Sequence, residues 1–266
     1  MNRILTFILA LEALSFPLAA QPSAQKEARE LPPQAAIVRG VLLPVPREIF
    51  QTLDRFAHSN WRAVQRPELA HWRPPGDQAQ DALLLGAVVA EGFIAVEAED
   101  TAETKNLGRA VLKQARALGV ERAALRRSRS IIDHAESGDW PGVRKEWDRV
   151  LPDVQRGMNE LRSDQLAQLV SLGGWLRGME ALAVLVSQDY SEEDARLLRQ
   201  PVLFDYFEKQ LAGMNGGLRT NPIVVRMGAG LRKVREVLPS GDEPVSQKKA
   251  TEISGVLAEL VKSLNR

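Results

Sequence analysis

From residue 78 onward, apolar residues recur at three- and four-residue spacing almost without interruption, and no stretch alternates as a β-strand would. Turns rich in Gly, Ser and Asp divide this pattern into about eight helices of ordinary length. The sequence therefore predicts an all-α fold with about eight main helices. The helices over residues 80–98 and 165–188 are apolar nearly all round, which is typical of helices buried at the centre of a fold.

The helical pattern also repeats along the chain. The motif Ser-Gly-Asp-x-Pro occurs at residues 137–141 and 240–244, and the apolar positions of the following helices match at the same offset of 103 residues. Further upstream the offset is 87 to 89, so we expect an insertion of about 15 residues in the second copy. The alternative is that helical seams match easily at any compatible register. We interpret the pattern as a tandem duplication of a four-helix unit, residues 78–161 and 162–266.

The first 20 residues have the layout of a secretory signal peptide. Arg3 precedes an apolar run, and the segment ends in Ala19 and Ala20. Glu12 interrupts the run, so the alternative is a buried or interfacial N-terminal helix; the run is far short of the ~20 residues that a transmembrane helix needs. We expect cleavage after Ala20 and export without a transmembrane span, which in a bacterium means the periplasm.

Two further segments precede the helical region. Residues 21–46 contain five prolines, which oppose regular helix and predict an extended spacer, with residues 37–43 lying against the domain surface. Residues 47–77 predict a short helix over 47–57, followed by a loop that contains two tryptophans.

The composition excludes several classes of function. Among 266 residues, 35 Lys and Arg oppose 34 Asp and Glu, so the net charge of +1 gives no reason to expect a nucleic-acid partner. The absence of cysteine excludes disulfides, thiolate metal sites and cysteine nucleophiles, and three histidines leave little room for a metal enzyme. The common serine-hydrolase, zinc-protease and phosphate-loop motifs are missing. We therefore expect no catalytic residues, metal or cofactor.

Three charged residues fall within the two most apolar helices: Glu91 in the first, and Arg177 and Glu180 in the second. Arg177 and Glu180 are three residues apart and can pair on one helix face. A carboxylate in an apolar core either pairs or has its pKa raised. These residues are candidates for lining a polar cavity, and the alternative, which the residue types favour, is a structural ion pair.

A second set of candidates lies in the loop over residues 58–72. His58, Trp61, His71 and Trp72 could ligate a metal or stack on a ligand. No third metal ligand lies at a useful spacing, so packing of the tryptophans onto the helices is the favoured alternative. The arginines of residues 122–129 are interpreted as a solvated helix face because acidic residues flank them.

These observations leave the function open. They favour an exported, soluble helical protein that acts as a non-catalytic binding or structural interaction module, with a protein or a small ligand as its partner. One alternative is a carrier of a small ligand or metal, with a polar cavity between the two core helices. A second alternative is an enzyme of unfamiliar type.

Overall fold

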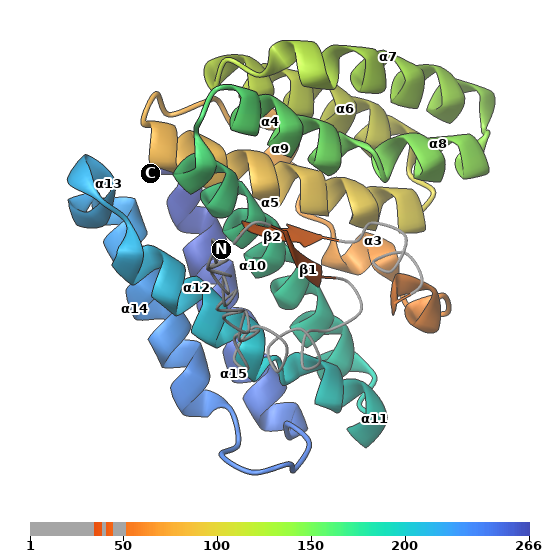
Figure 1. Ribbon diagram of the computed structural model, residues 1–266. Coiled ribbons are helices and arrows are strands. Elements are labelled where there is room, and N and C mark those ends of the chain that lie inside the picture. Colours follow the sequence, from red (N-terminus) through yellow and green to blue (C-terminus); the bar gives the residue numbers. More distant parts are fainter. Residues whose placement is uncertain (1–34, 39–40, 45–51) are drawn as a thin grey trace, which may run out of the picture.

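The computed structural model describes residues 35–38, 41–44 and 52–266, and it confirms the all-α fold (Figure 1). The signal peptide predicted over residues 1–20 lies outside the described residues and stays a prediction. The strands that the described residues contain are two short ones near the N-terminal end of the described chain.

The first half of the helical region packs in sequence order. α5 contacts α6, α6 contacts α7, and α7 contacts both α8 and α9. The apolar spacing of Trp147, Val150, Val154 and Leu161 fits one continuous helix, but Asp148 and Arg149 form a turn that divides it. Pro152 explains the division, because in a continuous helix its ring would clash with the carbonyl of Asp148, whereas the first turn of a new helix tolerates it. The bounds are α5 (Gln78–Glu97), α6 (Thr101–Ala117), α7 (Glu121–Ser137), α8 (Trp140–Trp147) and α9 (Val150–Glu160).

The second half is built around α10. This helix packs along α15, α15 packs on α14, and α14 contacts α12. Pro201 and Pro222 occupy the first positions of α12 and α14, where a missing N–H leaves no hydrogen bond unmade. The bounds are α10 (Asp164–Gln188), α11 (Glu192–Ala195), α12 (Pro201–Gly213), α13 (Gly216–Thr220), α14 (Pro222–Val237) and α15 (Gln247–Lys262).

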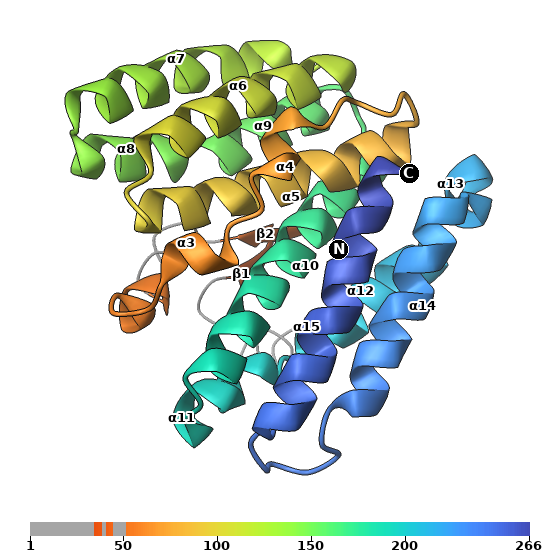
Figure 2. The same ribbon diagram turned by 180° about the vertical axis from the view of Figure 1, so that it is seen from behind.

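The two halves meet where α5 packs against α10. In both views the helices α6 to α9 lie on the α5 side, and α12, α14 and α15 lie on the α10 side (Figures 1 and 2). Two glycines set the distance between the helices: a Cβ at Gly86 would lie 1.9 Å from the carbonyl oxygen of Val170, and one at Gly173 would lie 1.9 Å from that of Leu83. The backbones therefore touch, and only glycine allows this approach.

α5 and α10 are the central helices that the sequence predicts. By length and composition alone, each could cross a membrane. However, 94% of the most apolar window of α5 and 72% of that of α10 are buried within the fold. The core helices of water-soluble proteins have the same character, so these two helices are weak evidence for a membrane span.

The segment before α5 is more ordered than the sequence predicts. β1 (Ala35–Val38) and β2 (Val41–Pro44) pair as an antiparallel hairpin within the proposed spacer, and β2 lies next to α9 and α10. In the described part of the predicted 47–57 helix, Thr52 and Leu53 are helical and the 3₁₀ turn η1 (Asp54–Phe56) follows them; residues 47–51 lie outside the described residues. The predicted loop contains two one-turn helices, α3 (Trp61–Val64) and α4 (Glu68–His71).

The two Ser-Gly-Asp-x-Pro motifs adopt different structures. In the first, Gly138 ends α7 with a left-handed φ of 71°, and the Asp139 carboxylate caps α8 by accepting from the backbone N–H of Gly142 at 3.0 Å. In the second, α15 begins only after Ser246, and Asp242 instead accepts hydrogen bonds from Arg199. The tandem duplication stays a prediction, which a superposition of α5–α9 on α10–α15 would test.

Candidate functional site

The three charged residues of the core helices meet in one buried cluster. Arg177 Nε donates to Glu91 Oε2 at 2.7 Å across the contact between α10 and α5. On α10 itself, Arg177 Nη1 lies 3.3 Å from Glu180 Oε2. All three residues have no exposed surface. The structure thus joins residues that the sequence places on two separate helices.

A fourth residue, Arg66, completes this cluster. Its backbone N–H donates to Glu91 Oε1 at 2.6 Å, and its guanidinium donates to Glu180 Oε1 through Nε at 3.0 Å and Nη2 at 2.6 Å. Arg177 Nη2 donates to the carbonyl of Val64 at 2.5 Å. The sequence analysis missed Arg66 because it lies between two short helices, outside any periodic pattern. A charge count was the available signal, since two buried carboxylates need more than one arginine.

The cluster fastens the segment around residues 64–66 to both core helices. Burial lowers the pKa of Arg66, but Glu180, Glu68 and Glu91 outweigh it, so the pKa is raised above its ordinary value. Two guanidinium groups balance two carboxylates, and each carboxylate contacts both arginines. A neutral, paired set of this kind is what allows charges to remain inside a protein, although Arg177 Nη1 and Glu180 Oε2 face each other without forming a hydrogen bond. Its chemistry is that of a structural ion-pair cluster.

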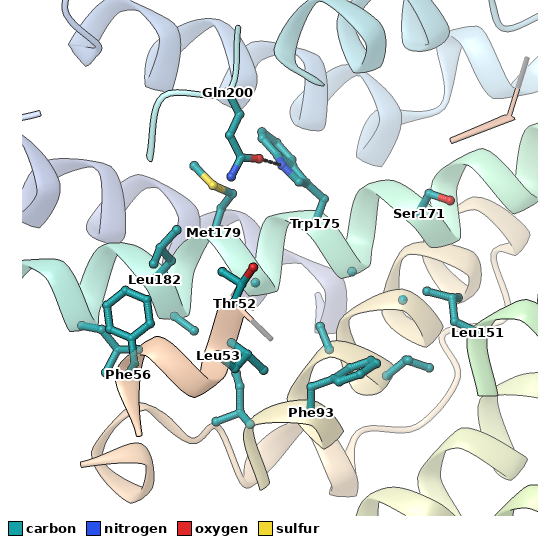
Figure 3. Close-up of a pocket in the computed structure, with 18 of the residues that line it drawn as sticks. Thr52, Leu53, Phe56, Phe93, Leu151, Ser171, Trp175, Met179, Leu182 and Gln200 are labelled. Atoms are coloured by element: carbon teal, nitrogen blue, oxygen red, sulfur yellow. Dashed lines mark hydrogen bonds between the residues drawn. The ribbon is translucent and has the colours of Figure 1, made fainter. Parts of the chain in front are cut away.

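A cavity of about 190 Å³ lies beside this cluster, and neither Glu91 nor Glu180 lines it. Side chains from α5, α10, α9 and α12 and from the residues around η1 surround it, as Figure 3 shows. No charged side chain is among the described residues that line it. The large side chains of the wall are Leu53, Phe56, Trp61, Val89, Phe93, Ile94, Leu151, Trp175, Met179, Leu182, Leu185 and Leu203.

Two of the polar side chains of the wall are hydrogen-bonded to other protein groups, whereas the buried Nε1 of Trp61, which also lines the cavity, has no hydrogen-bond partner among the described residues. Ser171 Oγ accepts from Gln155 Nε2 at 3.0 Å and donates to the carbonyl of Ala167 at 3.2 Å. Gln200 accepts from Trp175 Nε1 at 2.8 Å and donates to the carbonyl of Leu197. Thr52 is the third polar residue of the wall. The surface offered to a ligand is therefore mainly carbon.

The four loop candidates do not form one site. Trp61 is buried and lines the cavity. Trp72 packs against the main core, and its carbonyl accepts from Lys113 and Gln114. His58 and His71 are exposed. Among the described residues, no three His, Asp or Glu side chains are arranged to hold a metal ion.

The arginines of α7 are mostly solvated, with one exception. Arg122, Arg126 and Arg129 are exposed, but Arg127 is buried and donates to Glu146 at 2.7 Å and to Asp153 at 2.8 Å. Burial lowers the pKa of Arg127, and the two carboxylates outweigh burial and raise it. Arg127 thus ties α7 to α8 and α9 rather than contributing to a basic surface.

Glu97, at the end of α5, is the described carboxyl group whose pKa is brought into the neutral range. Burial raises the pKa to about 7; Arg144 opposes this shift, and Asp54 and Glu99 add to it. Arg144 Nη2 bridges Glu97 at 2.7 Å and Asp54 at 2.6 Å. The side chain of Glu97 is 7% exposed, while that of Asp54 is 53% exposed.

This raised pKa predicts a pH dependence of stability. A glutamate in the unfolded chain has a pKa of about 4.3, so the folded state binds the proton more tightly between about pH 4.5 and pH 7. The free energy of unfolding should therefore fall as the pH rises through this range. Urea unfolding gives the free energy of unfolding at pH 5 and at pH 8. The value at pH 5 minus the value at pH 8 should be smaller by about 1–3 kcal/mol in Glu97→Gln than in the wild type. An unchanged difference would contradict the assignment.

Comparison with known proteins does not add to this geometry. No protein-family model, no curated protein and no solved structure matches the chain. A function must therefore be argued from the ion-pair cluster and the cavity. The cluster has every carboxylate paired, whereas the cavity has free volume and a consistent lining.

Proposed function

We propose that this protein is an exported, non-catalytic helical protein that binds a small apolar molecule in the cavity beside α5 and α10. The observation that carries the proposal is a pocket of about 190 Å³, partly open to solvent, whose described wall is rich in carbon and contains no charged residue. Ligand sites in proteins are concave and mainly apolar, with few polar groups. Apolar cavities of about 150 Å³ stay dry and accept benzene.

The size of the cavity indicates the size of the ligand. At about 190 Å³ it has room for a substituted benzene ring or a short hydrocarbon chain. The aromatic side chains Phe56, Phe93 and Trp175 offer edges and faces to such a molecule. A larger ligand would have to leave part of itself outside.

Other functions have less support in the structure. The Glu91–Arg177–Glu180 cluster has no unpaired carboxylate to act as a base or a metal ligand. A protein partner would need a contiguous apolar face. In the part of the chain that the structure describes, the exposed large hydrophobic residues are Leu161, Tyr190 and Val225, which lie on separate elements. A small ligand is therefore favoured over a structural interaction module.

Export is the second part of the proposal, and it rests on the layout of residues 1–20 alone. Removal of the segment at Ala20 would leave a mature chain that begins at Gln21 and keeps the net charge of +1, since Arg3 and Glu12 leave together. N-terminal sequencing of protein purified from its own host should therefore read Gln-Pro-Ser. A mature protein beginning at Met1 would contradict export by this signal.

Ligand binding can be tested with fluorobenzene as the probe, followed by ¹⁹F NMR on the full-length mature protein. Gly178 lines the cavity, and a Cβ built there meets no atom within 4 Å, so a larger side chain would occupy free space. We expect saturable binding to the wild type and an affinity at least about tenfold weaker in Gly178→Leu, because the leucine competes for the cavity.

Gly255→Leu is the matched control. Gly255 also lies inside a long helix, α15, with no atom within 4 Å of a built Cβ, and it does not line the cavity. It should bind fluorobenzene as the wild type does. Absence of saturable binding to the wild type, or equal binding to Gly178→Leu, would contradict the proposed site.

A further inference from the structure

A second hollow, outside the cavity, lies where the N-terminal end of α7 meets the C-terminal end of α9. This groove has a volume of about 770 Å³ and shares no described lining residue with the cavity. Three exposed arginines line it, Arg122 and Arg126 from α7 and Arg156 from α9. Leu161, which is 53% exposed, lines it as well. The groove thus combines positive charge with an apolar side chain that the fold leaves largely uncovered.

The positive charge of the groove is only partly balanced within the molecule. Of its three acidic side chains, Glu121 and Asp153 already form ion pairs with arginines. Glu160 is the third, and Arg122 and Arg126 form no ion pair with any described residue. The N-cap residue of α7 accepts no hydrogen bond through its side chain, so the unsatisfied N–H groups of this helix end add partial positive charge. The groove therefore suits a partner that carries carboxylate groups.

The end of α10 carries a surface of the opposite charge. Four exposed residues follow this helix: Asp189, Tyr190, Glu192 and Glu193. We call residues 189–193 the acidic tip. Glu193 forms an exposed ion pair, whereas Asp189 and Glu192 form none with any described residue. α10 has no basic residue in its last turn, so the carbonyl groups at its C-terminal end add partial negative charge. With Tyr190 36% exposed, the acidic tip complements the groove in charge and also offers an apolar side chain.

α10 holds the groove and the acidic tip apart. The groove lies near the start of α10, because α9 ends at Glu160 and α10 begins at Asp164, and the acidic tip follows the other end of α10. α10 has 25 residues, which corresponds to about 37 Å at 1.5 Å per residue. In both views α11 lies at the opposite end of α10 from α9 (Figures 1 and 2). The acidic tip of a molecule therefore cannot reach the groove of the same molecule.

We infer that a second copy of this protein occupies the groove: the acidic tip of one molecule docks between α7 and α9 of the next. Unpaired carboxylates then meet unpaired guanidinium groups, and Tyr190 covers Leu161. Both surfaces are on the same chain, which favours a second copy over an unrelated acidic protein. The contact is small and relies on charge, so the association is weak, with a Kd of about 0.1 mM. Because the two surfaces differ, the contact repeats head-to-tail and forms chains or rings.

Sedimentation velocity on the full-length mature protein tests the contact. The mean mass of the wild type should rise between about 10 µM and about 1 mM protein. Raising the salt concentration from about 0.05 M to about 0.5 M should weaken the association at least about tenfold. The groove variant Arg122→Glu/Arg126→Glu and the tip variant Asp189→Lys/Glu192→Lys should each stay monomeric, because like charges then face each other.

An equimolar mixture of the two variants gives the sharpest result. The groove variant keeps an intact acidic tip, and the tip variant keeps an intact groove, so one contact can form between them. We expect a one-to-one dimer that does not grow further, since neither molecule has a second intact surface. A monomeric wild type at about 1 mM would overturn the inference, and so would a mixture that forms no dimer.

Arg226→Glu/Arg232→Glu is the matched control. It reverses two exposed arginines of α14 that form no ion pair with any described residue and that lie outside the groove and the acidic tip. This variant should associate as the wild type does, and an equal loss of association in it would overturn the assignment to the groove. The contact shares no described residue with the cavity, so fluorobenzene should bind the groove variant and the tip variant as it binds the wild type. Self-association and ligand binding are therefore tested independently of each other.

Discussion

Arg177→Met is expected to lower the free energy of unfolding by about 3–5 kcal/mol, because removing one partner of a buried ion pair leaves an uncompensated charge. Arg177 has no exposed surface and contacts both Glu91 and Glu180. Arg66 would be left facing two buried carboxylates, and the carbonyl of Val64 would lose its donor. Urea unfolding monitored by circular dichroism measures the loss.

Two further variants separate this effect from the loss of an arginine in general. Arg156 is 68% exposed and pairs with Asp153 at 3.1 Å, so Arg156→Met should cost less than about 0.5 kcal/mol. Adding Glu91→Gln to Arg177→Met removes the excess negative charge and should recover about 1–2 kcal/mol. A loss below about 1 kcal/mol in Arg177→Met would show that the cluster does not stabilise the fold as described.

The second large effect is expected at the contact between the core helices. A Cβ added at Gly173 would lie 1.9 Å from the carbonyl oxygen, 2.7 Å from the carbonyl carbon and 2.9 Å from the Cα of Leu83. These are backbone atoms, so α5 must shift as a whole. Gly173→Ala should therefore lower the free energy of unfolding by about 3 kcal/mol, at the upper end of the cost of overpacking. Thermal or urea unfolding measures it.

Gly178→Ala is the control on the same helix. Five residues further along α10, a built Cβ meets no atom within 4 Å. Alanine has the higher helix propensity, so this variant should be more stable than the wild type by about 0.5–1 kcal/mol. If the two alanine variants had equal stability, the close approach of α5 and α10 would be refuted.

Helical periodicity predicts the class of the fold and its centre because it is a local property. The all-round apolar pattern of residues 80–98 and 165–188 identifies α5 and α10 as core helices. The same pattern makes Glu91, Arg177 and Glu180 conspicuous, since charged residues are rare in such a setting. The spacing of Arg177 and Glu180 also predicts that the two lie close together on one helix.

Local patterns fail where a few residues decide the structure. The two Ser-Gly-Asp-x-Pro motifs share their letters, yet Asp139 caps a helix and Asp242 accepts from Arg199. The proline at position 152 divides a helix whose apolar spacing runs on through the division. Turn conformation depends on the tertiary contacts of each turn, which the motif does not encode.

By itself the sequence determined an all-α protein with two central helices and with charged residues in its core. Only the tertiary structure decided that Arg66, 114 residues from Glu180, balances the cluster. The tertiary structure also decided where the cavity lies, because its wall combines side chains from several segments far apart in the chain. The physical reason is that helical periodicity reports which residues share a face, whereas a long-range pair or an unfilled volume depends on how those faces pack together.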